Sequence, residues 1–243
     1  MYVAMAGAKQ SYATQAVVAH NIANANTAGF RSDLYLFVSL PMYGPGHPTR
    51  VNPLAVQGGW ERATGSQQTT GRSLDVAIDG QGYLAVQARD GTEAYTRGGD
   101  LQLDADGRLV TSSGNPVLGQ QGPITIPDNT SIEVGTDGTI SVVAQGQGPE
   151  TVGAVERLKL VNPDVSSLSK GVDGLLRLAG GGSAPADESV RVAAGCLEDS
   201  NVNVPEAMVN MIVLARRYEA QVRMMHVASE NAAATQRLTG PAG

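Results

Sequence analysis

Residues whose type and spacing would support catalysis or metal binding are scarce in this 243-residue chain. The three histidines, His20, His47 and His226, lie far apart, and none has neighbours at the spacing of metal ligands. The single cysteine, Cys196, has no histidine close to it in the sequence that would activate the thiol. The sequence therefore predicts neither a metal site nor a cysteine nucleophile.

Three short strings match fragments of known sites. Asp104-Ala-Asp106-Gly107 is similar to the start of a calcium loop, but the further ligands are absent, so a hairpin turn is favoured. Ser167-Leu-Ser-Lys170 fits the S-x-x-K string of penicillin-recognising enzymes without its companion strings. The paired carboxylates Glu198 and Asp199 precede a predicted helix, where solvated or capping roles are expected. We predict no active site and no cofactor.

Composition excludes several classes of partner. Only 16% of the residues are charged and the net charge is −6, so no basic field is available for nucleic acid or anionic lipid. One cysteine excludes an internal disulfide framework. No apolar run approaches the roughly 20 residues that a membrane span needs, and no cleavable signal peptide is visible. We expect no membrane span.

The first 30 residues predict a helix with an unusual surface. Apolar or small residues recur in steps of four and three at Met1, Met5, Ala8, Tyr12, Ala19 and Ile22. The other face is polar but uncharged, with Gln10, Ser11, Thr14, Asn21 and Asn24. Such a face suits a helix surrounded by other protein, because a buried charge would be costly. Gly29 is placed to end the helix.

Residues 203–239 predict a second, longer helix. Asn203 can cap it, Pro205 falls in its first turn, and Glu206 completes an arrangement similar to a capping box. At a rise of 1.5 Å per residue this helix would be about 54 Å long. A coiled-coil-type seam follows steps of four and three through Val204, Met208, Met211, Ala215, Tyr218, Val222, Met225, Ser229 and Ala232. We expect the two helices to pair, with outer faces that contact other subunits.

The segment between the helices reads as β-structure. Asp-Gly supplies the positive φ of tight hairpin turns, and the pair occurs at Asp79-Gly80, Asp90-Gly91, Asp106-Gly107, Asp137-Gly138 and Asp173-Gly174. The predicted fold class is α+β, with paired coiled-coil-like terminal helices and a central all-β domain of short strands and Asp-Gly hairpins. The predicted divisions are an N-terminal helix (1–30), an extended connector (31–70), the β-domain (71–186), a return connector (187–202) and the C-terminal helix (203–243).

Three blocks resemble the signatures of one family. They are His20–Phe30 (HNIANANTAGF), Glu198–Ile212 (EDSNVNVPEAMVNMI), and Gly71–Gly80 (GRSLDVAIDG) followed by YLAV and YTR strings. In this order they resemble the bacterial flagellar rod and hook proteins. The strings Leu214–Glu219 and Gly153–Val161 are most similar to the proximal rod members, and the distal rod members are the alternative.

The resemblance implies a structural subunit of the basal-body rod, the periplasmic drive shaft that transmits torque and encloses the export channel. Its partners would be copies of itself, other rod proteins and the flagellar type III export apparatus, which exports family members unfolded without a cleavable signal. The terminal helices would be poorly ordered in the lone subunit and stack in an inner tube layer. The family's first helix is expected to begin a few residues before Met1.

The residues expected to serve assembly fall into two groups. The first group comprises polar side chains and turn residues near the ends of the two helices: Asn21, Asn24, Asn26, Thr27, Gly29, Phe30, Asn201 and Asn203. The helix surfaces contribute Met5, Tyr12, Ala19, Ile22, Met208, Met211, Tyr218, Val222 and Met225.

Two other classes remain open. A carbohydrate-binding or hydrolytic β-domain acting on cell wall would need convergent carboxylates or aromatic residues, and Trp60 is the only tryptophan. A coiled-coil adhesin or secreted structural protein would share the seam but should lack the asparagine-rich block before Gly29.

Overall fold

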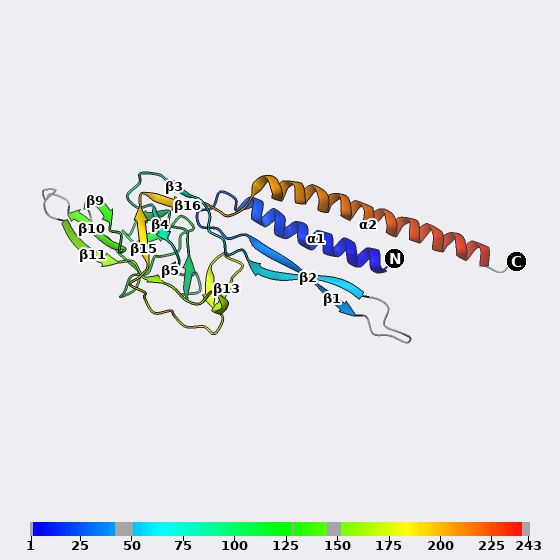
Figure 1. The fold of residues 1–243 in the computed structure, drawn as a ribbon, viewed down its shortest axis with the longest axis horizontal. Coiled ribbons are helices and arrows are strands. Elements are labelled where there is room, and N and C mark those ends of the chain that lie inside the picture. Colours follow the sequence, from blue (N-terminus) through cyan, green and yellow to red (C-terminus); the bar gives the residue numbers. More distant parts are fainter. Residues whose placement is uncertain (1, 42–50, 128, 145–151, 240–243) are drawn as a thin grey trace. The chain divides into compact units, whose positions relative to one another are not determined.

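The computed structural model describes residues 2–41, 51–127, 129–144 and 152–239 (Figure 1). It is an α+β fold with a helix at each end and a β-rich central region. The chain divides into two compact units. The helical unit comprises residues 1–25, 32–61 and 202–243, and the β-rich unit comprises residues 26–31 and 62–201. The short segment 26–31 therefore belongs to the β-rich unit although both of its neighbours in the chain are helical-unit segments.

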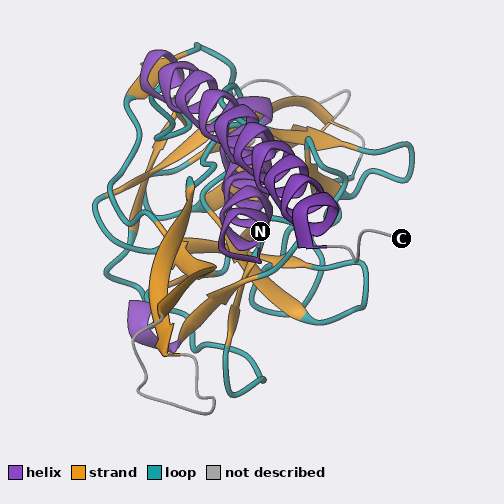
Figure 2. Cartoon of the chain, turned by 90° about the vertical axis from the view of Figure 1, so that its right-hand side faces the viewer, coloured by secondary structure: helices purple, strands orange, loops and turns teal. Residues whose placement is uncertain are grey.

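The helical unit consists of two helices and a hairpin. Helices α1 (Tyr2–Ala23) and α2 (Val204–Thr239) lie side by side and run in opposite directions (Figures 1 and 2). Strands β1 (Asp33–Pro41) and β2 (Val51–Trp60) form an antiparallel pair that contacts α1.

This hairpin falls in the range for which the sequence indicates an extended connector. Its apolar residues are consecutive instead of alternating, as in Leu34–Val38, so the two-residue period of a strand is hidden. In the structure, Leu36 lies opposite Val56 and Val38 lies opposite Leu54, and all four side chains remain exposed.

The β-rich unit is built from short antiparallel strands. One sheet has five strands in the order β12-β5-β6-β14-β13, and a second has three in the order β11-β10-β9. Strand pairs β15-β4, β16-β3 and β7-β8 complete the unit. The bounds of the five-stranded sheet are β12 (Leu160–Val161), β5 (Tyr83–Gln87), β6 (Glu93–Thr96), β14 (Leu176–Leu178) and β13 (Leu168–Lys170). The three-stranded sheet has β9 (Asn129–Val134), β10 (Thr139–Ala144) and β11 (Val152–Arg157).

The remaining pairs connect distant parts of the chain. They comprise β3 (Gln67–Thr69), β4 (Val76–Asp79), β7 (Leu101–Leu103), β8 (Leu109–Thr111), β15 (Arg191–Ala194) and β16 (Cys196–Glu198), and a 3-10 turn, η1 (Val165–Ser167), precedes β13. Strands β15 and β16 lie in the range predicted as a return connector. Strand β15 pairs with β4 and strand β16 pairs with β3, so this segment is part of the β-rich unit.

Asp-Gly turns join several neighbouring strands. The glycines at 91, 107, 138 and 174 have φ between 73° and 82° and lie between the paired strands β5-β6, β7-β8, β9-β10 and β13-β14. The turn at Asp79-Gly80 is different, because β4 pairs with β15 and not with β5, the next strand in the chain. A simple meander of successive strands does not describe the unit.

Aliphatic side chains fill the interior of the β-rich unit. On β10, Ile140 and Val142 are buried while Ser141 and Val143 are half-exposed, which is the period of a strand with one covered face. On β5, all residues from Tyr83 to Val86 are buried, so both faces of this strand are covered. The fully buried members of the core include Val86, Leu101, Leu109, Val117, Ile124 and Ile140.

A buried ion cluster ties the ends of the β-rich unit together. Glu198, 1% exposed, accepts from Arg31 Nη2 at 2.6 Å and from Arg97 Nη1 at 3.0 Å. The Gly65 backbone N–H donates to the same carboxylate at 3.2 Å. The expectation of a solvated or helix-capping role for Glu198 is therefore wrong, because distant parts of the chain supply its partners.

We predict that Glu198→Gln lowers the free energy of unfolding of the β-rich unit by about 3–5 kcal/mol. The substitution removes the negative charge and leaves two buried guanidinium groups without compensation. Urea unfolding monitored by near-ultraviolet circular dichroism measures the change. Glu188→Gln is the matched control, since the Glu188 side chain is 85% exposed, and it should shift the value by less than about 0.5 kcal/mol. Equal effects of the two substitutions would contradict the prediction.

Candidate assembly interface

Helix α1 buries a narrow face within the helical unit. Ala8, Thr14 and Val18 are 1–5% exposed. The Thr14 hydroxyl donates to the Gln10 carbonyl at 3.0 Å, so this buried polar group is satisfied inside its own helix. A Cβ atom added at Gly7 would lie 2.8 Å from Cδ of Gln221, so the Gly7 face of α1 lies directly against α2.

The apolar stripe predicted for α1 only partly coincides with the face that the unit buries. Of its described members, Ala8 is buried and Ile22 is half-buried, whereas Met5 and Tyr12 are 57% and 67% exposed and Ala19 is exposed. The buried Thr14 belongs to the face predicted to be polar. Small residues with an internally bonded hydroxyl allow close helix approach, and this leaves the larger Met5 and Tyr12 side chains outside.

Helix α2 also buries a face that differs from the predicted seam. Leu214, at 5% exposure, is its most buried large residue and was not part of the prediction. Met211 and Met225 are half-buried as a seam requires, whereas Tyr218 and Val222 are 40% exposed. The least exposed positions of α2 are Val204, Ala207, Met211, Leu214, Ala215, Gln221, Met225 and Ala228, and of these Ala215 also belongs to the predicted seam. The predicted seam is thus displaced by one residue at alternate steps, because apolar residues on several faces of α2 make both patterns fit.

The outer faces of α2 remain strongly apolar. Eight large apolar side chains are 39–60% exposed: Met208, Val209, Ile212, Val213, Tyr218, Val222, Met224 and Val227. A helix that is apolar on most sides is normally surrounded by protein or lipid. Among the described residues, no helix is long and apolar enough to cross a membrane.

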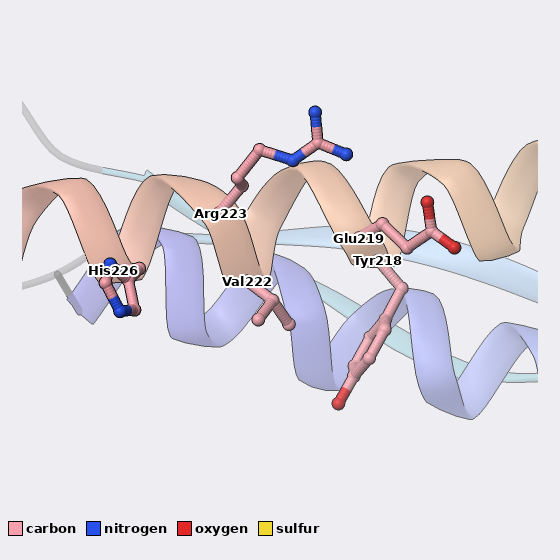
Figure 3. A pocket seen from close by; sticks show the side chains of 5 residues that line it. All are labelled: Tyr218, Glu219, Val222, Arg223 and His226. Atoms are coloured by element: carbon pink, nitrogen blue, oxygen red, sulfur yellow. The ribbon is translucent and has the colours of Figure 1, made fainter.

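One of these faces forms an open groove of about 380 Å³ (Figure 3). It is lined by Tyr218, Glu219, Val222, Arg223 and His226. Figure 3 shows Tyr218 and Val222 on the side of α2 nearer α1, with Arg223 pointing away from α1. An apolar floor with charged edges has the character of a protein-binding surface.

Asparagines organise the ends of both helices. The Asn21 side chain accepts from Asp33 N at 2.8 Å and donates to Asp33 O at 3.0 Å, which fixes the start of β1 beside the end of α1. Asn24 Nδ2 donates to the His20 carbonyl at 2.9 Å. At the start of α2, Asn203 Oδ1 accepts from Glu206 N at 3.3 Å. Sequence reasoning missed Asp33 and the 2.8 Å contact of its carboxylate with His20 Nδ1, because no local pattern joins these residues.

The other predicted polar residues lie in the β-rich unit. Asn26 and Thr27 are exposed. Gly29 has φ +66°, and a Cβ atom there would lie 2.2 Å from the Arg97 carbonyl carbon, so only glycine fits. Phe30 is buried, with Lys170 Nζ 4.1 Å from its ring centroid. Asn201 Nδ2 donates to the Ala63 carbonyl at 2.9 Å.

The histidines and the cysteine of the described residues do not form a metal site. No group of three histidine, cysteine or acidic side chains is arranged to hold a metal among those residues. Cys196 is half-buried, and its Sγ atom lies 3.7 Å from the Thr69 hydroxyl. His47 lies outside the described residues.

Comparison with known proteins connects the terminal helices to one family. Residues 1–31 match the model of the flagella basal body rod protein, residues 193–238 match the flagellar basal body rod FlgEFG protein C-terminal, and residues 77–142 match the flagellar hook protein FlgE/F/G D1 domain. The chain is 42% identical to the flagellar basal-body rod protein FlgF of Escherichia coli K12, over 98% of this chain and 97% of that protein. The chain belongs to the flagellar basal-body rod protein family.

Other rod proteins give the same result. Identity is 42% to FlgF of Salmonella typhimurium, over 95% of this chain and 94% of that protein. Identity is 34% to the rod protein FlgG of Buchnera aphidicola subsp. Acyrthosiphon pisum, over 90% of this chain and 91% of that protein. Members of this rod family are structural proteins, and this chain is not an enzyme.

We predict that cysteines at positions 7 and 221 cross-link within one chain in assembled rods. Gly7→Cys and Gln221→Cys, with Cys196→Ser to remove the native thiol, place two thiols on facing sides of α1 and α2. A short bis-maleimide followed by gel electrophoresis and peptide mapping detects the product. Gly7→Cys with Arg223→Cys is the control, because Arg223 points away from α1. Equal cross-linking of the two pairs would contradict the antiparallel arrangement.

Proposed function

We propose that this protein is a subunit of the proximal rod of the bacterial flagellum. In this role it joins other rod proteins in the periplasmic drive shaft, which carries torque from motor to hook and encloses the export channel. The observation that carries the proposal is the 42% identity to FlgF along nearly the whole of both chains.

The apolar helix surfaces suggest how the subunit assembles. The exposed faces around Met208, Ile212 and Val222 on α2, and Met5 and Tyr12 on α1, would be covered by neighbouring subunits. In this proposal the contacts between subunits are head-to-tail and their rotation does not close, so they generate an open helical array instead of a ring. In that array α1 and α2 would act as a coiled-coil-like pair in the inner layer, and the β-domain, shaped by its Asp-Gly hairpins, would lie outside.

Export fits the same role. The partners would be copies of this chain, other rod subunits and the flagellar type III export apparatus, and the chain would leave the cell interior unfolded without a cleavable signal. The functional divisions would be the two terminal helices (1–30 and 203–243), the connectors (31–70 and 187–202) and the β-domain (71–186). The helices gain most of their burial on assembly, so protease resistance of both ends in a soluble monomer would count against this part of the proposal.

A distal rod role is the alternative, supported by the 34% identity to a FlgG protein. Quantitative mass spectrometry of purified hook–basal bodies, with other rod proteins as internal references, separates the two. A few copies per particle support the proximal rod, and a several-fold larger count supports the distal rod. Absence of the chain from the particles would overturn both.

We predict that Val222→Glu prevents incorporation into the rod and abolishes swimming while the β-rich unit stays folded. The substitution places a charge on the apolar floor of the groove on α2, which assembly would bury. The same mass-spectrometric count and a soft-agar motility assay measure the outcome.

Val172→Glu provides the matched control, since Val172 is fully exposed at the turn between β13 and β14. This variant should incorporate and swim normally. Normal swimming of the Val222→Glu strain, or an unfolded β-rich unit in that variant, would contradict the proposed use of the groove.

A further inference from the structure

The turn at Asp79-Gly80 differs chemically from the other four Asp-Gly turns of the chain. An aspartate followed by glycine can close a five-membered succinimide ring, because glycine has no side chain to hinder attack of its amide nitrogen on the aspartate carboxyl. The reaction requires the carboxyl and the N–H of the next residue to meet. Hydrogen bonds to either group oppose the reaction, since they have to break before the ring can close.

In the four turns that join paired strands, the glycine N–H is engaged. Each of these N–H groups donates to the carbonyl three residues earlier, at 2.9–3.1 Å: Gly91, Gly107, Gly138 and Gly174. This hydrogen bond closes the turn itself. The glycine nitrogen is therefore held away from the aspartate side chain for as long as the hairpin is intact.

Threonine side chains hold the carboxylates of two of these turns. Asp90 Oδ1 accepts from the Thr92 N–H at 2.9 Å and from its hydroxyl at 2.6 Å. Asp137 accepts from the Thr139 N–H at 3.1 Å and from its hydroxyl at 2.7 Å. These hydrogen bonds lower the pKa of both aspartates. Ring closure consumes the protonated carboxyl, so the hydrogen bonds slow it in this way as well.

Arginine side chains hold the carboxylates of the other two. Arg177 donates to both carboxylate oxygens of Asp173, at 2.9 and 2.6 Å. Arg108 Nη2 donates to Asp106 Oδ2 at 3.1 Å, and this contact is weak because the Asp106 side chain is 74% exposed. The hydrogen bond of the Gly107 N–H is therefore the main protection of that pair.

Both groups are free at Asp79-Gly80. Asp79 is the exposed last residue of β4, and its carboxylate has no hydrogen bond or ion pair with any described residue. The Gly80 N–H also lacks a hydrogen-bond partner among these residues, because Gly80 lies beyond the pairing of β4 with β15. A Cβ atom at Gly80 would have no neighbour within 4 Å, so the space around the turn is open.

We propose that Asp79-Gly80 is a site of spontaneous isoaspartate formation. The Gly80 nitrogen attacks Cγ of Asp79, a N–Cγ bond forms, and the carboxyl OH leaves with the amide proton as water. Water then adds to one of the two ring carbonyls. Addition at the original main-chain carbonyl carbon breaks its bond to the Gly80 nitrogen and gives isoaspartate, whereas addition at Cγ restores aspartate. The reaction needs no oxidant or enzyme, and the inference is independent of the proposed function.

Isoaspartate at this position would weaken the buried cluster around Glu198. The Gly80 carbonyl accepts from Arg97 Nη2, and the Gly82 carbonyl accepts from Arg97 Nε at 3.0 Å. Arg97 Nη1 is in turn one of the two cationic partners of Glu198. Isoaspartate adds one carbon atom to the main chain directly before Gly80, so this carbonyl and Arg97 have to move relative to each other. Modified chains should therefore unfold at a lower temperature than unmodified ones.

Tryptic mapping of the full chain tests the proposal, because trypsin places the five Asp-Gly pairs in five different peptides, with Asp79 in residues 73–89. The protein is aged at physiological temperature in mildly acidic buffer, either folded or in guanidinium chloride, and isoaspartate is located by electron-transfer fragmentation. In guanidinium chloride all five pairs should react at similar rates. In the folded chain Asp79-Gly80 should react about tenfold faster than each other pair, since the hydrogen bonds of those pairs have to open first.

Asp79→Glu is the control, because glutamate would have to close a six-membered ring and the exposed side chain at this position tolerates the change. Aged Asp79→Glu protein should contain no isoaspartate in peptide 73–89 and should keep its melting temperature, whereas that of the aged wild-type protein falls. Equal rates at the five pairs of the folded chain, a faster reaction at another pair, or modification at Asp75 instead of Asp79 would overturn the proposal. An unchanged melting temperature of modified wild-type chains would overturn the predicted effect on the Glu198 cluster.

Discussion

The β-rich unit depends on the neutralisation of one buried carboxylate. Glu198 ends β16, just before the chain leaves for α2, and its partners come from residues 31, 65 and 97. A carboxylate at 1% exposure is tolerated only when its partners are in place, so these segments have to meet in a single geometry. Local contacts reinforce this arrangement, since the Gly29 N–H donates to the Glu198 carbonyl at 2.7 Å and Arg97 also binds the carbonyls of Gly80 and Gly82. The cluster thus sets where the flanking segments can lie within this unit.

The helical unit follows a different principle. Its helices bury a narrow face containing Thr14, Val18 and Leu214, and they leave most of their apolar surface exposed. Helix α1 also carries few charges, since Lys9 is its only Lys, Arg, Asp or Glu residue. An isolated subunit with these surfaces is incomplete, whereas in an array each exposed methionine or valine would gain a covering neighbour. Our proposal that neighbouring subunits cover these faces would make burial between subunits the completion of this unit's core.

The sequence predicted the long elements better than their contacts. Both terminal helices were expected, because their periodic patterns extend over many turns, and Asn203 directly precedes α2 as predicted. The predicted end of the first helix at Gly29 was wrong, since α1 ends at Ala23 and Gly29 belongs to the β-rich unit. The prediction of which face of α2 packs inward was only half correct. Leu214 and Met208 fit helical periodicity equally well, and only the position of α1 decides which of them is buried. The β1-β2 pair was missed because Leu34–Val38 does not alternate. The role of Glu198 was predicted wrongly because its arginine partners, Arg97 and Arg31, lie 101 and 167 positions earlier in the chain. No local sequence pattern indicates contacts over such separations.

The assignment of residues 26–31 has a consequence for dissecting the protein. A fragment cut to the continuous range 62–201 would look like a complete domain in the sequence, yet it would lack Arg31, Phe30 and Gly29. It would keep Glu198 while losing one of the two cations that neutralise it, and the place of the Phe30 ring against Lys170 would be empty. An autonomous version needs the six residues restored, either as an added peptide or by joining them to a new terminus through circular permutation. In this protein a unit of structure is therefore not a continuous stretch of sequence, and transfer of the β-rich unit to another chain has to include the short segment with the long one.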